Sequence, residues 1–166
     1  MLRRARAVAA CLLILAACGP APPVALGLAP AFELPDLAGG SLSTEALKGK
    51  VVVLDFWATW CGPCIAEIPH YAEFWRKNQA RGVEVVGVVF DSGEPEEIRA
   101  FVREHGIPYR QLLGNDQVLG AYRATQGFPT TFVVGAGGAI LAKIIGAQPG
   151  KFDSLQRTVD AALGSR

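Results

Sequence analysis

Residues 51–64 have the sequence VVVLDFWATWCGPC, in which an apolar run rich in valine ends abruptly at two cysteines, Cys61 and Cys64. Such a run predicts a buried strand. Behind the second cysteine, four apolar residues recur at steps of three and four, as on one face of a helix: Ile65, Ile68, Ala72 and Trp75. The cysteines therefore lie where a strand turns into a helix.

This position favours redox chemistry. The N-terminus of a helix presents free N–H groups and partial positive charge, which stabilise a thiolate. We therefore expect Cys61 to be exposed, to have a lowered pKa and to act as the attacking thiol, and Cys64 to be more buried. With only two residues between them, the pair can close a short disulfide ring. The pattern predicts a dithiol–disulfide redox site.

Two other interpretations of the cysteine pair are weaker. Half of a zinc site would need two more ligands, and the sequence offers only His70 and His105, at spacings unlike those of zinc modules. A purely structural disulfide would gain little, because closing so short a loop restricts the unfolded chain only slightly.

The segment also resembles a known family. Residues 55–58 and 60–64 resemble the active-site segment of thioredoxin, and the continuation over 65–69 resembles the TlpA/ResA branch, whose members are membrane-anchored extracytoplasmic thioredoxin-like reductases. The resemblance covers about residues 31 to 164, a length typical of one domain. It implies an α/β thioredoxin-like fold, in which helices flank a central mixed sheet. It also implies an N-terminal extension and an inserted strand–helix element before a cis-proline.

The first residues predict a targeting signal. Three arginines precede an apolar stretch over 7–17 that is too short to span a bilayer, so we assign residues 1–17 to a signal peptide. The stretch ends in Leu15-Ala16-Ala17-Cys18, which resembles the lipobox of bacterial lipoproteins and implies lipidation of Cys18. The alternative is a secreted protein cut near the same place, with Cys18 incidental.

Residues 18–30 are rich in proline and small residues and predict a lipidated tether, followed by a thioredoxin-like domain over 31–166. Removing the signal removes Cys11, so that lipidation of Cys18 would leave Cys61 and Cys64 as the free thiols. It also removes three arginines and makes the formal charge of +1 slightly negative. No basic patch then suggests nucleic acid, and we expect a lipid-anchored monomer.

The rest of the chain predicts alternating helices and strands, as in an α/β sheet. The first expected elements are a hairpin-like lead-in over 31–50, with Ser43 capping a helical turn, and a helix that contains Pro69 and ends near 81–82. A strand over 83–90, a helix from 95 to 105, a strand over 109–113 and a helix over 115–122 should follow. The chain should end in a hairpin of 131–134 with 139–145 and a closing helix from 151. The helix from 95 should bury Ile98, Phe101, Val102 and His105, the last of these in a structural role, and the closing helix should bury Phe152, Leu155, Val159 and Ala162. His70 should face solvent.

A second chemical element follows in Gly127-Phe128-Pro129-Thr130. Proline entering a strand cannot donate to the ladder and needs a local reason. The resemblance implies that Pro129 is cis and faces the cysteines across a groove, which leaves the backbone of Phe128 to pair with an extended substrate. The residues expected to bind the substrate are Trp60, Gly62, Pro63, Phe128, Pro129 and Gly146.

The expected chemistry is thiol–disulfide exchange. Cys61 attacks a substrate disulfide, and Cys64 then attacks Cys61 and releases the reduced product. Asp55 occupies the place of thioredoxin's buried acid and should accept the proton of Cys64, with a pKa raised by burial. Glu67 matches the active-site glutamate of the ResA type and is either a second proton handler or a solvated acid of the first helix.

Gly62-Pro63 is the dipeptide of reducing thioredoxin, so we predict a protein-disulfide reductase without a cofactor. Outside the cytoplasm it needs electrons from a membrane thiol carrier. The resemblance suggests apocytochrome c or a copper-site protein as client. Two alternatives fit less well. A peroxiredoxin needs threonine where Ala58 stands, and a Sco-type copper-binding factor has one more residue between its cysteines and a later histidine than His105.

Overall fold

The computed structural model describes residues 25–164 of the chain. Within them, one mixed sheet has the strand order β5-β4-β3-β6-β7. Its strands are β3 (Val51–Trp57), β4 (Val83–Val89), β5 (Arg110–Leu113), β6 (Thr130–Val134) and β7 (Ile140–Ile145). β3, β4 and β5 run parallel, whereas β6 runs antiparallel to both β3 and β7. The α/β prediction is confirmed.

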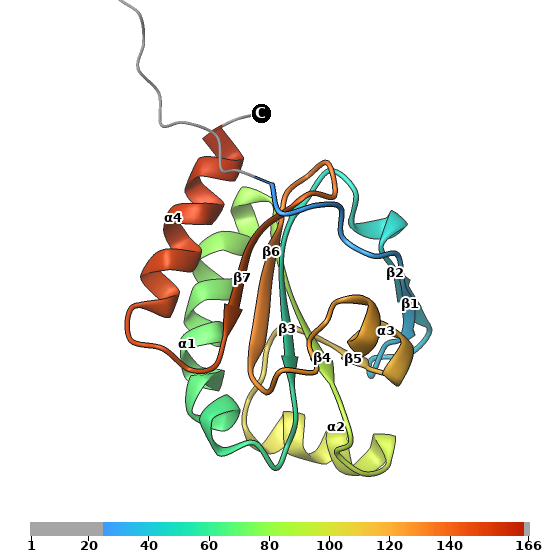
Figure 1. Cartoon of the computed structure of the whole chain (residues 1–166). Coiled ribbons are helices and arrows are strands. Elements are labelled where there is room, and N and C mark those ends of the chain that lie inside the picture. Colours follow the sequence, from blue (N-terminus) through green and yellow to red (C-terminus); the bar gives the residue numbers. More distant parts are fainter. Residues whose placement is uncertain (1–24, 165–166) are drawn as a thin grey trace, which may run out of the picture.

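Helices cover the sheet on both faces (Figure 1). α1 (Gly62–Asn78) and α4 (Lys151–Gly164) lie together on one face, while α3 (Asp116–Ala121) lies on the other face. The helix α2 (Pro95–Glu104) crosses near the end of the sheet where β3 passes into α1. Two short 3-10 turns complete the helical elements of the described residues, η1 (Glu45–Leu47) and η2 (Gln79–Arg81).

β3 is the centre of the fold because both of its faces are buried. Val51, Val53 and Trp57 belong to the apolar core beneath α1 and α4. The alternate residues Val52, Leu54 and Phe56 belong to a second core beneath the N-terminal hairpin and α3. A strand packed on both faces lacks polar alternation, which explains its continuous apolar sequence. Asp55 is the polar exception, and its side chain falls on the α1 face by the same alternation.

The helix starts follow the predicted signals. Pro95 begins α2, and Glu94 and Glu97 complete a capping box there. The side chain of Asn115 caps α3 by accepting a hydrogen bond from the N–H of Val118 at 2.9 Å. The β5–α3 insertion before the cis-proline is therefore present as expected.

Three predicted helix faces were partly wrong. In α1, Ile65 and Trp75 are only half-buried, and the buried side includes Cys64, Tyr71 and Phe74. Because this side faces the sheet, it also carries the polar Glu67 inward. In α2 the described helix buries Ile98, whereas His105 is exposed and stacks on Phe101 at 3.8 Å. In α4 the buried side starts with Lys151, and Phe152 is only half-buried. His70 is exposed, as predicted.

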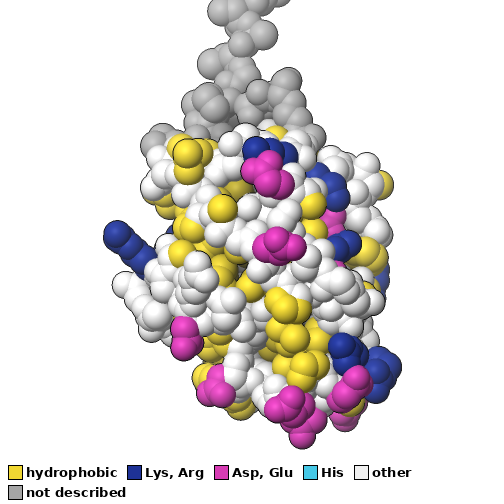
Figure 2. All heavy atoms as spheres, turned by 90° about the vertical axis from the view of Figure 1, so that its right-hand side faces the viewer, with side chains coloured by type: hydrophobic (Ala, Val, Ile, Leu, Met, Phe, Trp, Pro, Cys, Tyr) yellow, Lys and Arg dark blue, Asp and Glu magenta, His cyan; other side chains and the backbone are white. Residues whose placement is uncertain are grey.

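The N-terminal lead-in is the predicted hairpin, formed by β1 (Glu33–Pro35) and β2 (Ser41–Ser43). The N-cap of the turn η1 is Thr44, not Ser43 as predicted, although the hydroxyl of Ser43 accepts the N–H of Ala46 at 3.4 Å. Figure 2 shows the face that the hairpin and α3 present, where acidic and basic side chains are interspersed among apolar patches.

The predicted signal peptide 1–17 and Cys18 lie outside the described residues. Of the predicted tether 18–30, the described part lies against the domain. Leu26 donates a backbone hydrogen bond to Ile140 at 2.7 Å, and Ala29 donates one to Gly138 at 2.8 Å. Among residues 25–164, no helix combines the length and the apolar character needed to cross a bilayer.

Candidate active site

The two cysteines lie at the junction of β3 and α1, as predicted, and form a disulfide. Cys61 is the N-cap of α1, and its sulfur accepts the N–H of Cys64 at 3.3 Å. Gly62 and Pro63 occupy the exposed first turn, where proline suits a helix start because its missing N–H would have had no partner.

The expected difference in exposure between the cysteines is absent. Cys61 is only 5% exposed and Cys64 only 4%. The reason is that the disulfide turns the sulfur of Cys61 back over the helix end, where it bonds to the backbone of Cys64. The neighbouring Trp60 projects instead and is 62% exposed.

Trp60 is held beside the cysteines by the loop after β4. Its Nε1 donates to the carbonyl of Asp91 at 2.6 Å, and the N–H of Thr59 donates to the hydroxyl of Ser92 at 2.9 Å. The ring of Phe128 packs against it, with centroids 5.9 Å apart. An exposed aromatic fixed in this way gives a rigid apolar contact for another molecule.

The peptide bond between Phe128 and Pro129 is cis, as predicted. The carbonyl of Pro129 accepts the N–H of Gly146 at 2.7 Å, which brings the end of β7 beside the proline. Gly146 has a φ of 78°, a left-handed conformation that glycine adopts easily. Within residues 25–164, the backbone of Phe128 bonds to no other backbone group, which leaves its N–H and carbonyl available to a bound strand.

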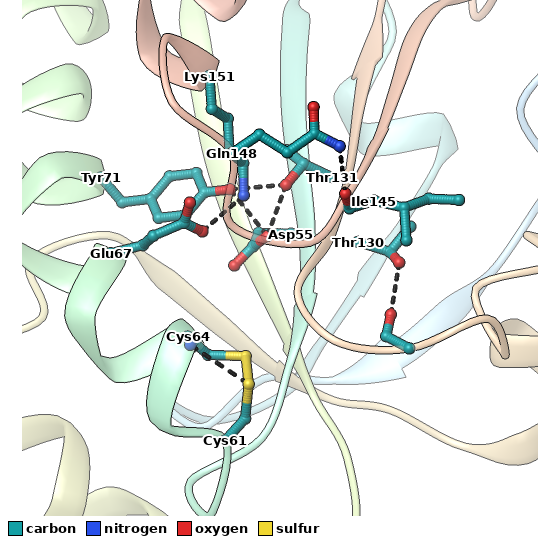
Figure 3. Close-up of polar contacts among 11 residues, drawn as sticks. Asp55, Cys61, Cys64, Glu67, Tyr71, Thr130, Thr131, Ile145, Gln148 and Lys151 are labelled. Atoms are coloured by element: carbon teal, nitrogen blue, oxygen red, sulfur yellow. Dashed lines mark hydrogen bonds and ion pairs between the residues drawn. A yellow bond between two sulfur atoms is a disulfide. The ribbon is translucent and has the colours of Figure 1, made fainter.

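Asp55 is buried and lies in a hydroxyl network on the α1 side of the sheet (Figure 3). Its Oδ1 accepts hydrogen bonds from Tyr71 at 2.8 Å and from Thr131 at 2.9 Å. Burial raises the pKa of Asp55 from 3.8 to about 6, against the opposing effect of the nearby Lys151. A carboxyl with that pKa can both accept and release a proton near neutral pH.

Glu67 is not a solvated acid. It is 6% exposed, and its Oε2 lies 2.6 Å from Nζ of Lys151, whose side chain is completely buried. Figure 3 shows both residues beside Asp55 and Tyr71, above the disulfide. An open pocket borders the pair, lined by Pro63, His70, Gly150 and neighbouring residues. The structure therefore brings Glu67 to the active site.

Three residues of this network escaped prediction: Tyr71, Thr131 and Lys151. Tyr71 follows Glu67 by one helical turn and Cys64 by two, which is a signal in the spacing. Thr131 pairs with Asp55 across β6, and that register is visible only in the sheet. Lys151 stands in the first turn of a helix, where the dipole disfavours a cation. A lysine at such a position could have indicated an acidic partner elsewhere in the fold.

Metal ligands do not gather in the described chain. Among residues 25–164, no three side chains of histidine, cysteine, aspartate or glutamate are placed to hold a metal ion. His70 instead packs against Phe152 at 5.3 Å.

Comparison with known proteins adds the family context. Residues 27–143 match the AhpC/TSA family. The thiol-disulfide oxidoreductase ResA of Bacillus thuringiensis (strain Al Hakam) is 34% identical over 122 residues, which are 72% of this chain and 69% of that protein. ResA of Bacillus subtilis (strain 168) is 37% identical over 120 residues, 71% of this chain and 65% of that protein. A Chlorobium tepidum structure assigned as a thiol:disulfide interchange protein DsbE has a TM-score of 0.77 at 30% identity and covers 86% of this chain and 99% of its own.

Proposed function

The chain belongs to the AhpC/TSA family and is a ResA-type thiol-disulfide oxidoreductase, and from that premise we propose that it reduces disulfides of other proteins outside the cytoplasm. The observation that carries this proposal is the Cys61–Cys64 disulfide at the start of α1, on the side of the sheet that also holds the buried Asp55. In the proposed cycle, this pair alternates between the disulfide and the dithiol form.

In the proposed reaction, the thiolate of Cys61 attacks one sulfur of the client disulfide, and the other client sulfur leaves as a thiol. Cys64 then loses its proton to Asp55 and attacks the sulfur of Cys61. The client leaves reduced, and Cys61 and Cys64 end as the disulfide described above. Two electrons pass from the protein to the client in each cycle.

We propose that the substrate binds along the surface formed by the cis-proline loop and the start of α1. We assign the contacts to the residues that surround the disulfide or line the adjacent loop: Trp60, Gly62, Pro63, Phe128, Pro129 and Gly146. The free backbone groups of Phe128 support pairing with an extended segment of the client. Ala58, which is fully buried and carries no hydroxyl, disfavours the peroxiredoxin alternative.

We further propose that the protein works on the outer side of a membrane and takes electrons from a membrane thiol carrier. Apocytochrome c, or a protein with a copper site, is the client class that fits the ResA-type resemblance. An outside carrier is needed because extracytoplasmic surroundings oxidise dithiols and would otherwise leave the protein in its disulfide form.

The reduction potential tests the proposed direction. Because Gly62 and Pro63 separate the cysteines as in thioredoxin, we expect a potential near the ~−270 mV of thioredoxin, far from the ~−120 mV of the oxidant DsbA. Equilibrating the purified protein with dithiothreitol buffers and counting free thiols measures it, and Cys61→Ser gives the baseline. A potential near that of DsbA would contradict the reductase function.

Lipid anchoring is tested separately. If Cys18 carries acyl chains, the full-length protein should partition into the detergent phase, because two or more chains anchor a protein stably. Cys18→Ala should move most of the protein into the aqueous phase, because it lacks the acyl chains. Phase separation followed by immunoblotting measures both variants, and Cys11→Ala is the matched control. If all three proteins partition equally into the aqueous phase, the lipid-anchor prediction is wrong.

A further inference from the structure

Lys151 is an unusual residue in this protein because two features of its position, burial and the positive end of a helix, are unfavourable for a cation. Its side chain is completely buried, and it stands in the first turn of α4, where the helix dipole is positive. Its Nζ contacts Oε2 of Glu67 at 2.6 Å and lies 5.2 Å from the ring centroid of Tyr71. A buried cation in such a place requires anionic partners, and the structure supplies two carboxyls around it.

We propose that Lys151 is a positioning residue that divides the work between these two carboxyls. By holding Glu67 as its ionic partner, it leaves Asp55 as the group that exchanges a proton with Cys64. This inference rests on the thiol–disulfide exchange proposed above, and it concerns which acid serves that exchange and how the protein selects it.

The groups around Asp55 explain why a single lysine can decide which carboxyl takes the proton. From α1 it is faced by Glu67 and Tyr71, from α4 by Lys151, and from the segment before β5 by Tyr109. Burial raises the pKa of both tyrosines well above 10, so neither is charged near neutral pH. Glu67 and Lys151 form the ion pair of this cluster, with one group of each sign.

The balance of these charges determines where a proton can go. A thiolate at Cys64 beside an ionised Asp55 would add a third buried negative group to a cluster that already holds two carboxylates and one cation. Transfer of the proton from Cys64 to Asp55 moves a negative charge without adding one, which costs much less in a buried site. Glu67 is engaged in the ion pair with Lys151, whereas Asp55 accepts hydrogen bonds from two uncharged hydroxyls.

The proposal predicts opposite effects of the two partners on Asp55. Glu67→Gln removes an anion and should lower the titration midpoint of Asp55 by about one pH unit. Lys151→Met removes the cation and should raise the midpoint by a similar amount. Combining the two substitutions should return the midpoint toward that of the unsubstituted protein. Lys50→Met, which breaks the exposed Lys50–Glu84 pair at the far end of β3, is the matched control and should leave it unchanged.

The midpoint is measured by ¹³C NMR of aspartate carboxyls in the disulfide-bonded protein, with Asp55 identified by the signal missing in Asp55→Asn. Because no turnover is needed, this readout stands apart from the redox assays that test the proposed function. Lys151→Met leaves Glu67 as an unpaired buried charge and can prevent folding. In that event, Glu67→Gln is compared with the double variant, which buries neither charge.

A purely structural role for Lys151 gives a different result. The midpoint of Asp55 would then be the same in Glu67→Gln and in the double variant, and this outcome would overturn the proposal. Shifts of the same sign for Glu67→Gln and Lys151→Met would overturn it as well. If the shifts are as expected, the pH dependence of the rate at which Cys64 attacks the mixed disulfide should move with the new titration midpoint of Asp55.

Discussion

Cys64→Ser should hold client proteins on Cys61 as mixed disulfides. The variant keeps the attacking thiol at the start of α1 but lacks the thiol that releases the product, so a complex once formed has no internal route of resolution. Turnover should fall to background, a loss of at least about a hundredfold, because the covalent intermediate no longer breaks down. Diagonal gels and mass spectrometry of the cell envelope then identify the trapped proteins.

The pattern of trapped proteins separates the possible functions. A reductase should hold a small set of cysteine-containing extracytoplasmic proteins together with one membrane thiol carrier. Cys61→Ser in the same background should trap no clients, and Pro129→Thr added to Cys64→Ser should prolong the complexes by altering the groove. Many unrelated secreted proteins would point to a general oxidase or isomerase instead. If nothing is trapped while Cys61 remains reduced, disulfide exchange is wrong.

Asp55→Asn should slow the resolving step while leaving the attack by Cys61 almost unchanged. Asparagine keeps the shape and can still accept the hydrogen bonds of Tyr71 and Thr131, but it cannot take the proton of Cys64. Loss of a general base typically costs about a hundredfold or more, so the second phase of a single-turnover experiment near pH 7 should slow by that factor. If the rate of this second phase is unchanged, Asp55 is not the base that takes the proton of Cys64.

The same substitution should make the protein more stable at neutral pH. Burial raises the pKa of Asp55 from 3.8 to about 6, so between these values the folded protein binds more protons than the unfolded chain. The free energy of unfolding therefore falls as pH rises from about 4 to about 6 and stays lowered above that range. Asp55→Asn has no carboxyl to ionise and therefore does not lose this stability. Its free energy of unfolding at pH 7 should be higher than that of the unsubstituted protein by up to about 3 kcal/mol.

Urea unfolding of the disulfide-bonded proteins at pH 7 and below pH 4 measures this difference. The gain of Asp55→Asn should disappear at the lower pH, because both forms of residue 55 are then uncharged. Asp153→Asn, on the exposed side of α4, is the matched control and should show no such gain. Equal stabilities of Asp55→Asn and the unsubstituted protein at pH 7 would mean that the Asp55 carboxyl carries no burial penalty.

Short-range sequence patterns were sufficient to predict the order of the helices and strands and the redox chemistry of the two cysteines. A strand that ends in Cys61-Gly62-Pro63-Cys64 and passes into a helix places a cysteine at an N-cap through short-range geometry alone. The capping residues Glu94 and Asn115 act over three residues, and the helices predicted from residues 95 and 115 begin beside them. The cis bond at Pro129 followed from the family resemblance and not from such a local rule.

The partners of the buried acids depended on packing between distant segments. Asp55 meets Tyr71 because β3 and α1 are packed face to face, and it meets Thr131 because β6 takes one particular register against β3. Periodicity placed Ile65 and Trp75 on the inner face of α1, where they are half-buried against the core, but it did not reveal that Glu67 is buried on that side as well.

The sequence by itself therefore determined the redox pair, the thioredoxin-like arrangement of strands and helices, and Asp55 as the buried acid, since each depends on neighbouring residues or on motif resemblance. The tertiary structure alone decided that Glu67 is an ion-paired residue of the site, because its partner Lys151 comes from a helix 84 positions further along the chain. Spacing along a sequence predicts only in part which face of a helix a residue occupies, since Ile65, Trp75 and Phe152 are half-buried. It does not predict which charge from another element that face will meet, and this charge decides whether a buried carboxyl stays ionised.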